Sequence, residues 1–221
     1  MINVSRTVLI GGFVLTTISG IVNAVGFLSF AHQGLTHLTG ITSHISLFVS
    51  NKEFDSAIKG VVLILSFVIG AVVSGYIVQK SNLKLGRNYG YVLIIESILL
   101  FLAIDFLNRQ SFTGECLVAS ACGLQNAMAS TYAGSILRTT HLTGVFTDLG
   151  IWIGHYLKNL TVDSFAIKIY FILIVGFFLG GVLGVFLFNR FEYYALIFPG
   201  SILCFSGILY TYLAHFKQEN A

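Results

Sequence analysis

The chain has 221 residues, of which 56% are hydrophobic and only 10% are charged. Several apolar runs approach the roughly 20 residues that cross a bilayer, which excludes an ordinary soluble domain and indicates an all-α polytopic membrane protein. The formal net charge is +3, but the basic residues are scattered between the apolar runs, so they give no indication of a nucleic-acid partner.

Six apolar runs are predicted to be transmembrane helices. In chain order they cover residues 8–30, 58–78, 89–107, 116–136, 168–188 and 193–215. The first run is too long for the apolar part of a signal peptide, so we expect it to be retained as a span. The three cysteines lie within apolar runs and lack CxxC spacing, which favours packing as small hydrophobic side chains.

Two weaker segments, residues 35–50 and 142–157, are too short and too polar to be predicted as spans. Each lies at a copy of the pentapeptide THLTG, found at residues 36–40 and 140–144. Glycine and threonine suit an interrupted helix, because glycine relaxes the backbone and threonine hydroxyls re-satisfy exposed backbone groups. We therefore expect each THLTG segment to be broken or re-entrant in the membrane.

The two THLTG copies belong to a longer internal repeat. The sequence GIVNA at residues 20–24 matches GLQNA at 123–127, and the spacing of the small residues at 66, 70 and 74 returns at 176, 180 and 184. The repeat predicts one membrane domain, 1–221, with repeat 1 at about 6–107 and repeat 2 at about 114–215.

The charge distribution bears on the orientation of the repeats. If the weak segments re-enter, each repeat has three spans and the second is inverted; eight of the twelve Lys and Arg residues are then cytoplasmic. If the weak segments cross, the best division is seven against five. The positive-inside rule therefore favours the inverted arrangement, with both termini and residues 80–87 in the cytoplasm.

Polar residues at the two interruptions form the predicted substrate site. Half-helices that begin at THLTG present unbonded N–H groups and a positive dipole end, and two such starts in inverted repeats frame a site near the bilayer midplane. The predicted substrate-binding residues are Asn23, His37, Thr39, Gly40, Asn126, His141, Thr143 and Gly144. Two alternatives stay open: THLTG caps a helix at the membrane surface, and the asparagines brace the interruption or bond to a neighbouring helix.

Two acidic residues are candidates for proton or ion coupling. Glu96 lies alone in the middle of the third span, where an ionisable group usually marks a proton, ion or substrate path. The alternative for Glu96 is a protonated side chain bonded to a neighbouring helix. Asp148 follows the second THLTG copy as His44 follows the first. A metal site is less favoured, because a glycine interrupts each helix, and no metal or cofactor is assigned. Its four ligands would be His37, His44, His141 and Asp148.

Small residues recur at every fourth position in the second and fifth spans. Gly176, Gly180 and Gly184 permit close helix packing, either within one chain or between copies. Because six spans make a small protomer, we expect a homo-oligomer that uses this face or its counterpart, Ser66, Gly70 and Ser74.

Several of these segments resemble the YoaK-like family of uncharacterised bacterial integral membrane proteins. The matching segments are GIVNAVGFL at 20–28, THLTG at 36–40, GLQNA at 123–127 and RTTHLTGVFTDL at 138–149, and the resemblance covers essentially the whole chain. The first half departs from the family pattern, which has Asp in place of Asn23 and Asn in place of Ile41. The resemblance implies a bacterial inner membrane and supplies no substrate.

The leading functional hypothesis is a small carrier or channel for an unidentified small solute, with its site between the two THLTG segments and the lipid bilayer around it. The rival is a membrane scaffold or sensor whose interruptions are structural. A membrane-embedded metal protein or enzyme comes third, since the chain has no GxSxG, HExxH or Walker motif and no paired catalytic carboxylates. No enzymatic activity is therefore expected.

Overall fold

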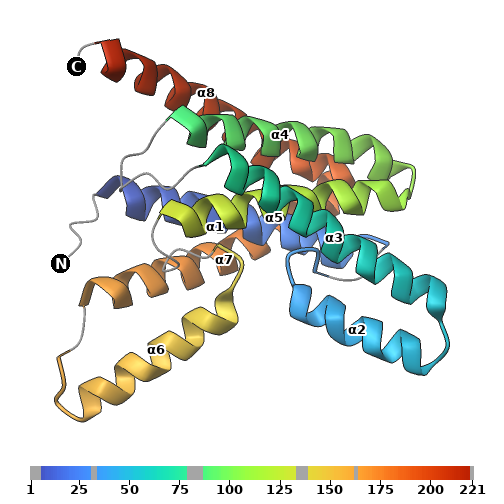
Figure 1. The fold of residues 1–221 in the computed structure, drawn as a ribbon, viewed down its shortest axis with the longest axis horizontal. Helices are drawn as coiled ribbons and strands as arrows, with labels where there is room; N and C mark the ends of the chain where they lie inside the picture. The colour runs from blue at the N-terminus through green and yellow to red at the C-terminus, as the bar shows by residue number, and fades with distance from the viewer. Residues whose placement is uncertain (1–5, 31–33, 79–86, 133–138, 162–163, 220–221) are drawn as a thin grey trace.

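The computed structural model describes residues 6–30, 34–78, 87–132, 139–161 and 164–219 (Figure 1). All regular structure within these ranges is helical. The helices are α1 Arg6–Leu28, α2 Leu38–Ser50, α3 Phe54–Ile77, α4 Arg87–Asn108, α5 Phe112–Tyr132, α6 Leu142–Leu157, α7 Ser164–Phe191, the short 3-10 helix η1 Glu192–Leu196, and α8 Ile197–Glu219. The prediction of an all-α protein is confirmed.

Each of the six predicted spans coincides with most of one long helix: α1, α3, α4, α5, α7 or α8. Four stretches of the described residues are long and apolar enough to cross a membrane. They are Leu9–Leu28, Phe54–Ile77, Asn88–Asn108 and Ala166–His215, the last of which contains α7, η1 and α8.

Helix α5 is not among these stretches, and its position explains why. Its side chains are buried along most of its length, including Val118, Leu124 and Gln125. A helix enclosed by other helices does not need the lipid-facing apolar surface that raises the hydropathy of the outer ones. The predicted span at 116–136 is therefore a central helix, and residues 133–136 lie outside the described residues.

The two weak segments form the short helices α2 and α6, of 13 and 16 residues. Both end in the same kind of turn. Lys52 and Asn159 have positive φ angles of 61° and 54°. The N–H of the next residue then bonds to a carbonyl five residues earlier, from Glu53 to Phe48 at 2.8 Å and from Leu160 to His155 at 3.0 Å. The two halves of the chain thus share local structure here.

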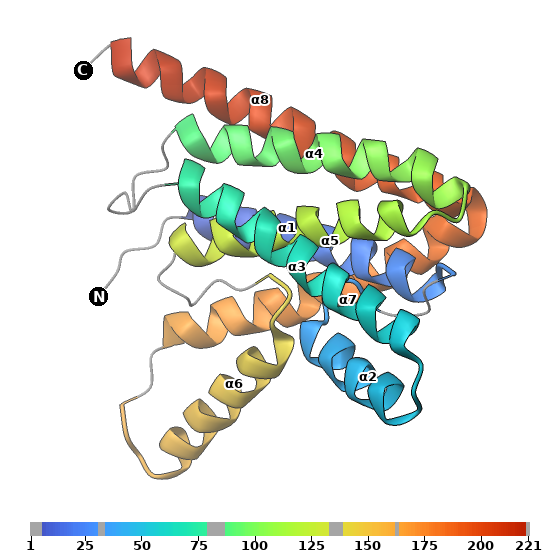
Figure 2. The ribbon, with the colours of Figure 1, turned by 45° about the vertical axis from the view of Figure 1, so that its right-hand side comes forward.

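The long helices pair across the two halves of the chain. Helix α1 packs along α7, α3 packs along α5, and α4 and α8 pack on each other (Figure 2). In both views α1, α4 and α7 cross the bundle in one direction, and α3, α5 and α8 cross it in the other. Helix α2 contacts α3, and α6 contacts α7, but α2 and α6 do not pack on each other.

Small residues allow the backbones to approach at two equivalent crossings. A Cβ added to Gly180 of α7 would lie 2.9 Å from the Thr17 Cα of α1, and one added to Gly70 of α3 would lie 3.0 Å from the Ser120 Cα of α5. Thr17 and Ser120 hold equal places in the two repeats, as do Gly70 and Gly180. The α1–α7 and α3–α5 crossings therefore share the same close backbone contact.

The glycine stripe of α7 is used inside the protomer. A Cβ on Gly176 would lie 3.2 Å from the Phe13 backbone oxygen, and one on Gly184 would lie 2.8 Å from the Ile21 Cα, both on α1. The prediction that Gly176, Gly180 and Gly184 form an oligomer contact is therefore wrong. Close packing of α7 on α1 of the same chain already occupies this face.

Candidate functional site

An asparagine at the end of the first helix of each repeat holds the following THLTG segment. The Thr36 hydroxyl donates to Asn23 Oδ1 at 2.7 Å. In the second repeat, Asn126 Nδ2 donates to Thr140 Oγ1 at 2.6 Å and also to the Cys122 carbonyl at 3.2 Å. The two bridges join equal places in the two repeats. They fit the bracing role, one of the three expected for these asparagines.

A histidine ring lies over the glycine in each THLTG copy. His37 and His141 occupy the N-cap positions of α2 and α6, and neither side chain caps its helix. A Cβ on Gly40 would overlap the His37 ring, and a Cβ on Gly144 would overlap the His141 ring. Glycine thus leaves space that the ring of its own segment fills. Gly40 and Gly144 are among the predicted substrate-binding residues, and here each faces a histidine ring.

The second threonine of each copy presents a hydroxyl to the surroundings. Thr39 and Thr143 are exposed, and neither hydroxyl forms a hydrogen bond within the described residues. Their carbonyls accept from Ser43 Oγ at 3.0 Å and Thr147 Oγ1 at 2.9 Å. The first turns of α2 and α6 therefore offer an unpaired hydroxyl beside N–H groups that no preceding turn can satisfy. Such a helix start suits polar or anionic groups.

The structure does not bring the two helix starts into contact. Both lie toward the middle of the molecule, and the helices diverge from there to opposite sides (Figures 1 and 2). No group of three or more His, Cys, Asp or Glu side chains within the described residues is placed to hold a metal. The alternative four-ligand site is therefore not assembled, although His37, His44, His141 and Asp148 are all described.

Glu96 is buried in the interior of the bundle. Its side chain on α4 is 2% exposed, and its Oε2 has no hydrogen-bond partner within the described residues. It lies within electrostatic reach of the Cys122 thiol on α5. The Cys122 carbonyl in turn accepts the hydrogen bond from Asn126. Glu96 is thus connected, through one turn of α5, to the second THLTG copy. Asp148 is half-buried on α6, one turn beyond that copy.

Two buried polar residues of α5 were not predicted as functional. Gln125 Nε2 donates to the Leu15 carbonyl at 2.8 Å and to Ser19 Oγ at 2.9 Å, which ties α5 to α1. Its place beside Asn126 in a repeated motif was the signal available in the sequence. Glu115 lies one residue before the predicted span; burial raises its pKa to about 7, and Lys59 partly opposes this increase.

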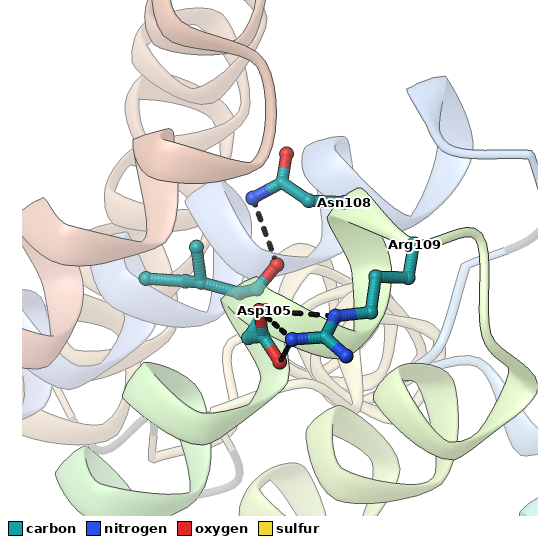
Figure 3. A network of polar contacts seen from close by, with 4 residues as sticks. Asp105, Asn108 and Arg109 are labelled. Carbon is teal, nitrogen blue, oxygen red and sulfur yellow. Dashed lines mark hydrogen bonds and ion pairs between the residues drawn. The ribbon is translucent and has the colours of Figure 1, made fainter.

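Charged side chains mark the end of α4. Arg109 donates to Asp105 Oδ1 through Nε at 3.2 Å and Nη2 at 3.0 Å, and Asn108 Nδ2 donates to the Ile104 carbonyl at 2.9 Å (Figure 3). The Arg109 and Asp105 side chains are 73% and 63% exposed. An ion pair this exposed adds little stability. It indicates that this end of α4 reaches water.

A family model described as a protein of unknown function, DUF1275, matches residues 11–209. The chain belongs to the DUF1275 family. No curated protein and no solved structure matches it. The DUF1275 match includes both THLTG copies and agrees with the resemblance to a whole-chain family of unknown function.

Proposed function

We propose that this DUF1275 protein is a small membrane carrier or channel built from two inverted repeats, residues 6–107 and 114–215. Two observations support the inversion. Helices at equal places in the two halves run in opposite directions (Figures 1 and 2). The crossing of α1 with α7 also has glycines at the same places as the crossing of α5 with α3, Gly20 and Gly180 in the first and Gly123 and Gly70 in the second. Inverted repeats with interrupted helices are a common architecture of transporters.

The proposed solute pathway runs past the first turns of α2 and α6. A helix of 13 residues is about 20 Å long, shorter than the roughly 30 Å of bilayer hydrocarbon, which supports re-entry of α2. The observation that carries the proposal is the pair of equivalent helix starts. Each is braced by an asparagine, and each presents an unpaired threonine hydroxyl. The solute is small and polar.

Binding residues of the proposed site are Thr39 and Thr143, with His37 and His141 beside them. Asn23 and Asn126 hold the helix starts, and Gly40 and Gly144 accommodate the histidine rings. Glu96 and Asp148 are the proposed coupling residues. Glu96 lies within electrostatic reach of Cys122, whose carbonyl bonds to Asn126, and Asp148 lies one turn beyond the second THLTG copy. We place the protein in a bacterial plasma membrane and assign it no catalytic role.

The experiment is ligand-induced thermal stabilisation of the purified protein across a panel of small polar solutes. Thr39→Val and Thr143→Val each remove one unpaired hydroxyl, so each should weaken binding by about 1 kcal/mol, or about fivefold. Thr42→Val and Thr147→Val are matched controls, because those exposed hydroxyls donate to the backbone of their own helices.

A solute that stabilises the wild type and all four variants equally would show that the THLTG segments are structural caps. That result would favour the rival function, a membrane scaffold or sensor. The hydrogen bonds between asparagine and threonine would then account for the repeated motif by themselves.

A further inference from the structure

An apolar cavity of about 440 Å³ lies between α1, α4, α5 and α8. Its floor consists of buried side chains, among them Ile18, Leu93, Met128 and Leu203. The lining contains no Asp, Glu, Lys, Arg or His. The volume falls within the range of about 300–1,000 Å³ that is usual for small-molecule pockets. The cavity therefore suits an apolar occupant.

The mouth of the cavity opens onto an apolar surface. The lining residues Ile10, Phe205 and Leu213 are 65%, 70% and 56% exposed. All three belong to stretches that are long and apolar enough to cross a membrane. An opening with such a rim faces hydrocarbon, because water would leave these large side chains without apolar contacts.

The length of the cavity corresponds to one leaflet. On α1 the lining runs over residues 10–18, and on α8 over residues 203–213. At 1.5 Å per residue these segments are about 12 Å and about 15 Å long, close to half of the roughly 30 Å hydrocarbon thickness. They lie in the first half of α1 and toward the end of α8, which are on the same side of the bundle (Figure 2).

The cavity occupies a position that is closed in the other half of the chain. Helix α5 packs closely along α4, whereas α1 and α8, the equivalent pair, make only slight contact. The space between α1 and α8 is thus a departure from the internal symmetry. In a membrane, hydrocarbon from the adjoining leaflet would fill it, since an empty space forfeits dispersion contacts on its walls.

We propose that this cavity is a binding site for one acyl chain of a bilayer phospholipid, inserted sideways between α1 and α8. The proposal is independent of the proposed transport function, because no THLTG residue lines the cavity. Gly11 offers a direct way to fill the site. It lines the cavity, and a Cβ added there would meet no atom within 4 Å, so Gly11→Leu would occupy the space without a clash at Cβ.

The test uses the full chain in vesicles of phosphatidylethanolamine and phosphatidylglycerol, doped with a phosphatidylcholine that carries a diazirine on one acyl chain. After irradiation, mass spectrometry locates the lipid adducts. We expect adducts to concentrate on residues 203–213 of α8 relative to the exposed apolar face of α3, which includes Val61, Val68 and Val72. Gly11→Leu should reduce the α8 adducts severalfold.

Gly75→Leu is the matched control, because Gly75 lies on α3 outside the cavity and its added Cβ also meets nothing within 4 Å. This variant should leave the α8 adducts unchanged. Adducts that are no denser on α8 than on α3 in the wild type would overturn the proposal without reference to any variant. Persistence of the α8 adducts in folded Gly11→Leu would overturn it too. So would a result in which free fatty acid reduces the α8 adducts and unlabelled phospholipid does not.

Discussion

At the scale of single residues, glycine and histidine act together at each helix start. The rings of His37 and His141 lie over Gly40 and Gly144, where a β-carbon would overlap them. This contact explains why each THLTG copy has glycine three residues after its histidine, which the composition of the segment does not reveal. Sequence reasoning singled out these residues, but the partner of each glycine depends on the rotamer of a neighbouring side chain.

Replacing Gly144 by alanine should displace the His141 ring. Alanine in a helix interior is normally favoured over glycine by about 0.5–1 kcal/mol, but here the ring must first rotate away. Gly150→Ala on the same helix is the control, because its Cβ meets nothing within 4 Å. We expect Gly150→Ala to show the full gain in thermal stability and Gly144→Ala to show less. NMR of the imidazole carbons should register a change only in Gly144→Ala; identical spectra in both would contradict the ring contact.

Glu115 should make stability depend on pH. Its pKa is about 7 in the folded protein, against an ordinary value of 4.5, mainly because it is buried. The folded state therefore binds more protons than the unfolded state between these values, and the free energy of unfolding should decrease as pH rises from about 5 to about 8. Glu115→Gln should remove this decrease and stabilise the protein at pH 8 by about 1–2 kcal/mol, because the neutral amide does not have to ionise in a buried position.

Thermal unfolding in detergent at pH 5 and pH 8 measures the effect. Glu53→Gln provides a control, because Glu53 is an exposed carboxylate at the start of α3. If Glu115→Gln and Glu53→Gln alter the difference in thermal stability between pH 5 and pH 8 equally, the pH dependence comes from overall charge and not from the burial of Glu115.

At the scale of helices, α7 has two neighbouring glycines in opposite surroundings. A Cβ on Gly180 would fall on the backbone of Thr17, whereas a Cβ on Gly181 would meet nothing within 4 Å. Gly180→Leu should therefore force α1 and α7 apart and destabilise the protein by more than about 2 kcal/mol. Gly181→Leu should have little effect. Thermal unfolding and size-exclusion profiles compare the two; equal stability would contradict the packing of α7 on α1.

Helix positions are also what the sequence predicted best. Apolar length located all six long helices, and the predicted bounds of 142–157 coincide with those of α6. Periodicity also identified the glycine stripe of α7, but a spacing of four residues does not reveal which helix faces it. The partner is α1 of the same chain. The cavity could not be predicted, because it results from a difference in packing between two equivalent helix pairs.

At the scale of the whole molecule, inversion requires that equivalent turns lie on opposite sides of the membrane. The turns after α2 and α6 have the same hydrogen bonds, and their C-cap residues, Asn51 and Lys158, are exposed with negative φ angles of −84° and −93°. Cysteine at either position should therefore fit without backbone strain and react equally when accessible. Any difference in labelling then reports the side of the membrane rather than local structure.

We predict that a membrane-impermeant maleimide applied to intact cells labels Asn51→Cys but not Lys158→Cys, in a background in which Cys116, Cys122 and Cys204 are alanine. The positive-inside rule places Lys158 in the cytoplasm with both termini, and the opposite directions of α3 and α7 then place Asn51 outside. Permeabilised cells should label both positions, which controls for reactivity. Labelling of only Lys158→Cys would reverse the orientation but keep the inversion. Labelling of both or of neither in intact cells would place the turns on one side, and the two halves would then be parallel copies.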